Sequence, residues 1–328
     1  MKHRILIVAG ITVVAVMSII LCPFFGIHTF SLESIFKDEN IRYIFTQIRI
    51  PRTLVAMCAG GALAVCGMVY QALFRNPLAD PYTLGVSSGA SLGAAVCIYT
   101  GVGGVVLGLP IVIAGAFTGA LVSVLLIYVF AWSRDSNSST LLLAGVIVAT
   151  LCSGLIMFIH FISGVHQSFQ IVRWIMGSVD SMNYQMLGII GIPVFIFMIV
   201  AIPVMTQLDH FLTGDSIAHS RGVNIQKSRI LFITVTALII GVIVAICGPI
   251  GFVGILGPHA CRMILPGVKH KMLAYTSFLT GGTFLVITDT LARSITPPTE
   301  IPVGIITSII GGPFFLVLLY KRRKKLMV

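Results

Sequence analysis

Long apolar runs, separated by short polar or Gly/Pro-containing stretches, make up most of the sequence. A helix needs about 20 predominantly apolar residues to cross the hydrocarbon core of a bilayer. Ten runs can be delimited, at residues 5–25, 53–73, 84–107, 109–132, 140–162, 185–207, 230–247, 248–266, 272–292 and 301–320. The pattern predicts an all-α polytopic membrane protein with about ten transmembrane helices, formed as a single transmembrane domain over residues 1–328.

Two of these runs differ from a plain membrane span. The first follows Lys2-His3-Arg4 as the apolar part of a signal peptide does, but it is longer and no small-residue cleavage site follows it, so we expect a retained helix. The eighth contains four glycines spaced three residues apart, at positions 248, 251, 254 and 257, with prolines at 249 and 258. Because a helix has 3.6 residues per turn, we expect a short, broken helix buried among its neighbours.

Composition agrees with a membrane protein and excludes several other classes. Hydrophobic residues make up 57% of the chain and charged residues 9%, against about 25% charge in soluble domains, and mean hydropathy is +1.05. These values exclude collagen, disordered chains, disulfide scaffolds and soluble nucleic-acid-binding proteins. The net charge of +11 is concentrated at the ends and in short loops. An even number of spans with both termini cytoplasmic places most of the 21 basic residues inside, as the positive-inside rule requires.

The apolar cores of the ten runs contain no Asp, Glu, Lys or Arg, and Asp289 lies near the end of its run. Ion-coupled transporters commonly carry ionisable groups near the middle of the membrane. The chain also has no C-x-x-C pair, no histidine pair for haem and no paired acids, so we expect neither a metal site nor a catalytic centre. The lack of charged residues in the apolar cores indicates that the energy for the protein's activity is supplied from outside this chain. Sodium can be held by carbonyl oxygens alone, so an ion-coupled secondary transporter stays the alternative.

Several stretches carry a resemblance to a known family. In the first half these are Arg49-Ile-Pro-Arg52, Asn76-Pro-Leu-Ala-Asp-Pro81 and Leu84-Gly-Val-Ser-Ser-Gly89. In the second half they are Gly248-Pro-Ile-Gly-Phe-Val-Gly254, Pro258-His259, Arg262, Glu300-Ile-Pro-Val-Gly304 and Gly312-Pro-Phe-Phe315. Together they resemble the FecCD-type permeases of ATP-binding-cassette (ABC) importers for iron-siderophore, haem and cobalamin, in consistent order from about Arg49 to Tyr320.

The resemblance implies a type II ABC importer permease in the bacterial plasma (inner) membrane. It implies partnership with a second permease copy, most simply as a homodimer, with two ABC ATPase subunits and with a substrate-binding protein, but with no nucleic acid. ATP and Mg would act in the ATPase subunits, since this chain has no G-x-x-x-x-G-K-[ST] motif and needs no cofactor of its own. The subunit would not be an enzyme, and would alternate between outward-open and inward-open states. The sequence does not identify the chelate.

The same resemblance assigns a cytoplasmic gate to two places. Asn76 and Leu78, in the loop between the second and third runs, would form one part of it, although Asn-Pro and Asp-Pro pairs also predict an ordinary capped turn. Ser139 and Thr140, at the start of the fifth run, would form the other. Small hydroxyl side chains at this position also suit an N-cap for the helix.

Three arginines fall on the outer face of the expected topology: Arg49, Arg52 and Arg293. In the family, arginines at these positions meet acidic residues of the substrate-binding protein, and the guanidinium group suits bidentate contact with a carboxylate. The alternative is an interaction within the same membrane region, with lipid headgroups or with Asp289 and Glu300.

The longest inner loop, at about residues 209–228, resembles the coupling segment that contacts the ATPase in importer permeases. Asp215, Ala218, Arg221 and Gly222 are its expected contact residues. The glutamate usual in the family is not evident, and Asp215 is the nearest acid.

Overall fold

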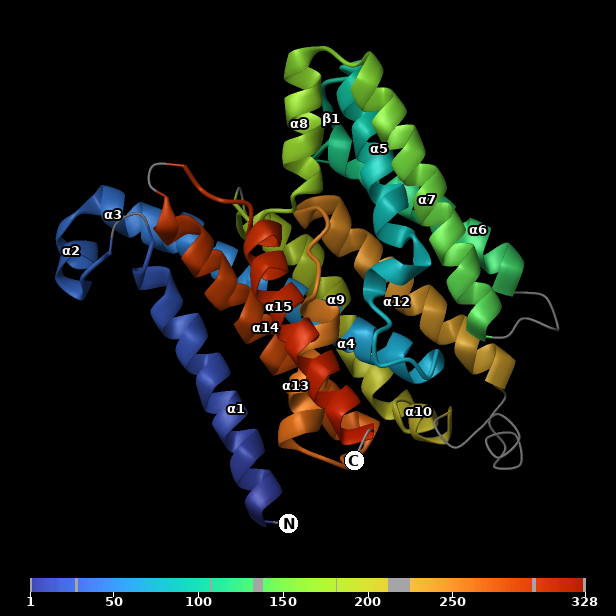
Figure 1. The fold of residues 1–328 in the computed structure, drawn as a ribbon. Coiled ribbons are helices and arrows are strands. Elements are labelled where there is room, and N and C mark those ends of the chain that lie inside the picture. The colour runs from blue at the N-terminus through green and yellow to red at the C-terminus, as the bar shows by residue number, and fades with distance from the viewer. Residues whose placement is uncertain are drawn as a thin grey trace.

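The computed structural model describes residues 2–26, 29–106, 108–131, 138–180, 182–211, 225–296 and 299–326. Each of the ten apolar runs contains one helix, and the expected all-α architecture is confirmed (Figure 1). These helices are α1 (Lys2–Leu21), α4 (Ile50–Leu73), α5 (Val86–Thr100), α6 (Ile111–Ala131), α7 (Ser138–Ile162), α9 (Tyr184–Val204), α12 (Ile225–Cys247), α13 (Val253–Ile264), α14 (His270–Ile295) and α15 (Val303–Leu326).

Six helical segments of the described chain are long and apolar enough to cross a membrane. They are His3–Phe24, Glu39–Leu73, Ile111–Val129, Thr140–Ile162, Tyr184–Val204 and Lys227–Cys247. Val86–Thr100 and Val303–Val317 are apolar but shorter. Helix α13 has only 12 residues, well short of the about 20 residues that a span usually needs.

Shorter elements lie between these helices, and the pattern of apolar runs did not predict them. They are η1 (Cys22–Phe24), α2 (Leu32–Lys37), α3 (Glu39–Tyr43), η2 (Ile44–Arg49), η3 (Pro81–Leu84), α8 (Val165–Ile175), α10 (Thr206–Phe211) and the paired strands β1 (Val105–Val106) and β2 (Leu109–Pro110). Local signals for two of them were present. Ser31 and Ser34 form a capping box at the start of α2, and the Asp38 carboxylate caps α3.

The third run is shorter as a helix than expected. Helix α5 ends at Thr100 because Gly101 adopts a left-handed conformation, with φ of 63°, which halts a helix as a C-terminal cap. The β1–β2 hairpin follows. Hydropathy did not distinguish this hairpin from a continuing span, since valines and leucines occupy both.

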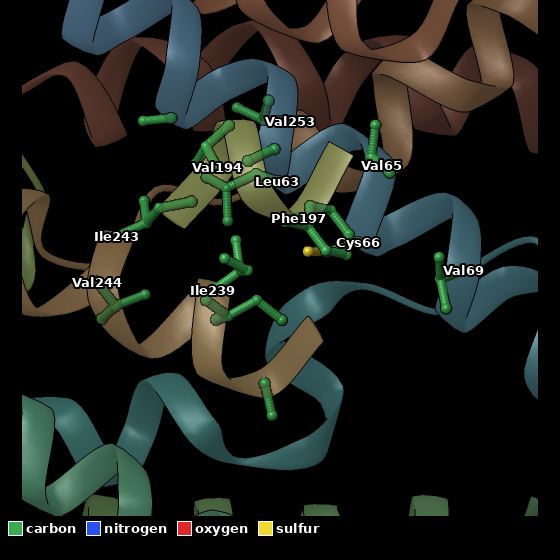
Figure 2. Close-up of a cluster of buried hydrophobic side chains, with 14 of the residues drawn as sticks. Leu63, Val65, Cys66, Val69, Val194, Phe197, Ile239, Ile243, Val244 and Val253 are labelled. Atoms are coloured by element: carbon green, nitrogen blue, oxygen red, sulfur yellow. The ribbon is translucent and has the colours of Figure 1, made fainter. Parts of the chain in front are cut away.

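Helix α4 is the centre of the bundle. Figure 2 shows its Leu63, Val65, Cys66 and Val69 in one apolar cluster with side chains of α9, α12 and α13, among them Phe197. Helix α14 packs along the same helix, with very close backbone contact: a Cβ at Gly60 of α4 would lie 2.6 Å from the Gly281 carbonyl oxygen. Small residues permit this approach between membrane helices.

The two ends of the bundle carry different elements. Helix α1 begins, α15 ends and α10 lies at one end, while α2, α3 and α8 lie at the other (Figure 1). The Arg4 guanidinium donates to the Pro266 carbonyl oxygen at 3.2 Å, which fixes the α13–α14 connection at the same end as the start of α1. Large apolar side chains are exposed along α1, α7 and α9, as lipid-facing or partner-facing helices require.

Candidate functional site

The glycine- and proline-rich run near residue 250 forms a break between two helices. Helix α12 ends at Cys247, α13 begins at Val253, and residues 248–252 are not helical. Gly248 has φ of 67° and Phe252, just before α13, has φ of 68°. A left-handed phenylalanine is unusual and holds α13 at an angle that a continuous helix would not allow. The expected short, broken helix is confirmed.

A second irregular segment joins α4 to α5 in the first half of the chain. The Asn76 side-chain oxygen accepts a hydrogen bond from the Leu78 backbone N–H at 3.0 Å, which is an Asx turn. The interpretation of Asn76 as a turn-forming residue is therefore confirmed. The Leu78 side chain is 42% exposed. Two residues further on, Asp80 immediately precedes η3.

These two irregular segments contact each other. The Tyr82 hydroxyl donates to the Ile250 carbonyl oxygen and accepts from the Ile250 N–H, both at 2.7 Å. The Tyr82 hydroxyl thus satisfies two backbone groups that the break in the helix leaves without intrahelical partners.

Two further segments meet at the same place. The Ser178 N–H, after α8, donates to the Cys247 carbonyl oxygen at 2.7 Å, and the Gly304 N–H at the start of α15 donates to the Gly177 carbonyl oxygen at 3.2 Å. A Cβ at Gly177 would lie 2.1 Å from the Pro249 carbonyl oxygen. We call this meeting point the junction and define it as residues 80–82, 176–178, 248–254 and 304.

Two cavities reach the junction. One, of about 570 Å³, lies between α5 and α7 and reaches Pro249, and its lining includes Ser87, Ser91, Ser153 and His160. The other, of about 460 Å³, reaches Gly248 and is lined by polar groups of α8 and of the turn that follows it. Hydroxyl and imidazole groups beside apolar walls can make hydrogen bonds to a polar ligand.

The second pair of expected gate residues lies at the start of α7. Ser139 and Thr140 are in its first turn, and Thr140 is exposed. The loop that carries Asn76 and Leu78 meets α7 further along the helix, where a Cβ at Gly85 would lie 3.0 Å from the Gly145 carbonyl oxygen. The gate role of all four residues stays a prediction.

Arg52 belongs to a buried network of charges. Its Nη2 lies 2.8 Å from Asp289 Oδ1, its Nε lies 3.0 Å from Asp289 Oδ2, and its Nη1 lies 2.7 Å from Glu300 Oε2. Asp289 is 1% exposed and Arg52 is 5% exposed. Of the interactions considered for Arg52 from the sequence, the structure contains the ion pairs with Asp289 and Glu300.

The other two arginines of this group also point into the chain. Arg49 Nη1 donates to the Pro23 carbonyl oxygen at 3.0 Å, and its guanidinium lies 3.7 Å from the centre of the Phe30 ring. Arg293 Nη2 donates to the Cys22 carbonyl oxygen at 2.8 Å. These contacts attach the segment after α1 to η2 and α14. Docking of another protein on these arginines stays a prediction.

The expected coupling residues Asp215, Ala218, Arg221 and Gly222 lie outside the described residues. The expected loop bounds of about 209–228 are too wide, since Asp209 is in α10 and residues 225–228 are in α12. The Asp209 carboxylate accepts from the His270 N–H at 3.1 Å and lies 2.6 Å from His270 Nδ1. Helix α10 is thereby attached to the start of α14.

Sequence reasoning missed several residues that form the junction. Tyr82 has no local feature that separates it from other tyrosines near a helix end. Gln71 and Arg262 were also not given a role, yet Arg262 donates to the Gln71 side-chain oxygen and Gln71 donates to the Gly254 carbonyl oxygen at 3.3 Å. Their signal was a polar side chain near the end of each of two otherwise apolar runs.

Comparison with known proteins connects this architecture to transport. The model of the FecCD transport family matches residues 11–321. The hemin transport system permease protein HmuU of Yersinia pestis is 37% identical over 88% of this chain and 86% of its own length. The cobalamin import system permease protein BtuC of Halobacterium salinarum is 38% identical over 87% of this chain and 75% of its own length.

A solved structure agrees with these relatives. An inward-facing conformation of a putative metal-chelate type ABC transporter matches with a TM-score of 0.87 at 31% identity, over 96% of this chain and 99% of that chain. The resemblance carried by the arginine, Asn-Pro and glycine motifs is thus confirmed over nearly the whole sequence. The chain belongs to the FecCD transport family.

Proposed function

We propose that this chain is the permease subunit of an ATP-driven importer for a metal chelate such as haem, cobalamin or an iron-siderophore complex. The observation that supports the proposal is the junction, where four segments from different parts of the chain contact one another beside two cavities. The chain that contains this junction belongs to the FecCD family. The named substrates of its relatives, hemin and cobalamin, supply the substrate class.

Alternating access would use the junction as the point about which helices reorient. Irregular backbone inside a bundle concentrates conformational change at a few residues, whereas continuous helices move as rigid bodies. Asn76 and Leu78, with Ser139 and Thr140, would close the path at the cytoplasmic end. A second copy of the chain would complete the path along their shared interface.

Energy would come from two partner ATPase subunits that hold ATP and Mg. We place the end of the bundle that carries the start of α1 and the end of α15 in the cytoplasm of the cell, at the plasma (inner) membrane. This orientation follows the positive-inside rule, because Lys2, Arg4, Lys269 and Lys271 lie at this end. The ATPases would contact the segment with Asp215, Ala218, Arg221 and Gly222.

A substrate-binding protein would dock at the opposite end, around Arg49, Arg52 and Arg293. Of the two acids paired with Arg52, the Glu300 side chain is 30% exposed and the Asp289 side chain 2% exposed. An acidic residue of an incoming protein would therefore exchange with Glu300 and leave the inner pair intact.

Coupling through Arg221 is tested by its substitution with alanine in the assembled complex. We expect R221A to lose the stimulation of ATP hydrolysis by the loaded binding protein, because the segment that transmits contact between the subunits is altered. Lys269→Ala is the matched control, since it removes an exposed cation at the same end of the bundle but outside residues 212–224. Equal stimulation in R221A and wild type would contradict the coupling assignment.

A further inference from the structure

A third cavity, of about 500 Å³, lies at the end of the bundle where α1 begins. The last turn of α4 with the loop after it, the α13–α14 connection and the first turn of α14 form its walls. Arg75, Arg262 and His270 contribute basic side chains, while Leu265 and Leu273 contribute apolar surface. Within the described part of the chain, no Asp or Glu lines this cavity.

Arg262 is the unusual member of this lining. Its side chain is partly buried, and the hydrogen bond that the structure gives it goes to the neutral side-chain oxygen of Gln71, which is 3% exposed. Among the described residues, no carboxylate lies within ion-pair distance of it. Because buried charges in proteins are normally paired, the cavity in front of Arg262 presents positive charge that lacks an acidic counterpart.

The nearest described acid serves a different residue. The Asp209 carboxylate binds the backbone N–H and the Nδ1 of His270, so it compensates the imidazole and orients it. Arg4 adds a further guanidinium beside the cavity, because it donates to the carbonyl oxygen of Pro266, a lining residue. Apart from His270, guanidinium groups at or beside the cavity thus come from three separate segments of the chain, through Arg4, Arg75 and Arg262.

We propose that this cavity binds a phosphate group, supplied by the headgroup of an anionic phospholipid. Arginine is the side chain best suited to phosphate, through charge-assisted and bidentate hydrogen bonds. Basic pockets between helices on the cytoplasmic side attract anionic headgroups. The apolar wall and the neighbouring Met263 and Ile264, which are 58% and 51% exposed, favour a lipid over free phosphate, because acyl chains need apolar surface beside the headgroup.

Occupation of the cavity would affect the loop that carries the expected gate. Arg75 directly precedes Asn76, and Pro77 is itself part of the lining. Gln71, which holds Arg262, also donates to the Gly254 carbonyl oxygen of the junction. A bound phosphate would therefore immobilise the loop between Gln71 and Pro81 from one side, while Tyr82 holds it from the other.

The proposal is tested by native mass spectrometry of the full-length permease extracted from nanodiscs of phosphatidylcholine with phosphatidylglycerol. We expect Arg262→Gln and Arg75→Gln each to reduce retention of phosphatidylglycerol about tenfold, the effect of losing one hydrogen bond to a charged group. Arg75 is exposed, so its variant reports binding even where R262Q folds poorly. Lys271→Gln, which removes an exposed cation outside the lining, should retain the lipid as wild type does.

A second arm identifies the source of the phosphate. In nanodiscs of phosphatidylcholine alone, thermal stabilisation by millimolar inorganic phosphate that disappears in R262Q would support the anion site and assign it to the free ion. Equal retention of phosphatidylglycerol by wild type, R262Q and R75Q would overturn the proposal. Displacement of the lipid when the ATPase subunits assemble would also overturn it, because the cavity would then be part of a protein interface. The lipid readout uses the permease alone, so its failure leaves the proposed transport function unaffected.

Discussion

Replacing Arg52 by alanine should destabilise the folded permease by about 3–5 kcal/mol, the usual effect of removing one partner of a buried ion pair. The cause is Asp289, which is 1% exposed and would be left buried without the guanidinium that now contacts both of its oxygens. The measurement is the midpoint of thermal unfolding of purified protein in detergent, followed by size-exclusion chromatography.

The matched control for this change is Lys37→Ala. Lys37 pairs with Glu33, but both side chains are more than 70% exposed, and exposed pairs contribute about 0–1 kcal/mol. A second control replaces Arg52 by Met together with Asp289 by Leu, which removes both members of this pair, while Arg293, 4.0 Å from Asp289, keeps its bond to the Cys22 carbonyl oxygen; it should recover most of the lost stability. Equal unfolding midpoints for R52A and K37A would contradict the structural role assigned to the network.

Gly254→Ala should disrupt the junction. A Cβ at this position would lie 2.2 Å from Pro81 Cδ and 3.1 Å from Asp80 Oδ1, so η3 would have to move away from α13. Overpacking of this kind typically costs about 1–3 kcal/mol. We expect a lower unfolding midpoint together with a loss of ATP-driven uptake, because the displaced segment carries both Asp80 and Tyr82.

Gly251→Ala is the matched control for this second change. Gly251 belongs to the same row of glycines, but a Cβ there would meet nothing within 4 Å. Its effect on stability should stay within about 0.5 kcal/mol, as for substitutions at unconstrained positions. Parallel loss of uptake in G251A and G254A would mean that the close contact between Gly254 and η3 is not what the transport cycle requires.

The helices of this protein were readable from sequence because the bilayer imposes a long apolar run on each span. The broken helix was also readable, since four glycines and two prolines over residues 248–258 disfavour one continuous helix, although Gly254, Gly257 and Pro258 lie within α13. The ends of the helices were harder to predict from the sequence. Gly101 stops α5 and a hairpin follows, although the residues of that hairpin are as apolar as a membrane span.

The contacts between distant segments were not readable in the same way. Arg52 and Asp289 are 237 positions apart, and hydropathy places each near the end of a run without stating which runs are neighbours. The Tyr82–Ile250 contact is equally non-local, and the carbonyl and N–H that it satisfies are backbone groups with no sequence signal. Family resemblance, carried by motifs in both halves, was the evidence that placed these motifs in one functional unit.

The central claim is that the chain is a conduit whose transport is energised by other subunits. The direct measurement is uptake of haem, cobalamin and a ferric siderophore into proteoliposomes. We predict uptake that requires ATP, the two ATPase subunits and the loaded binding protein, and no uptake by the permease alone under a proton or sodium gradient. Gradient-driven uptake by the permease alone would contradict the claim and favour an ion-coupled secondary transporter.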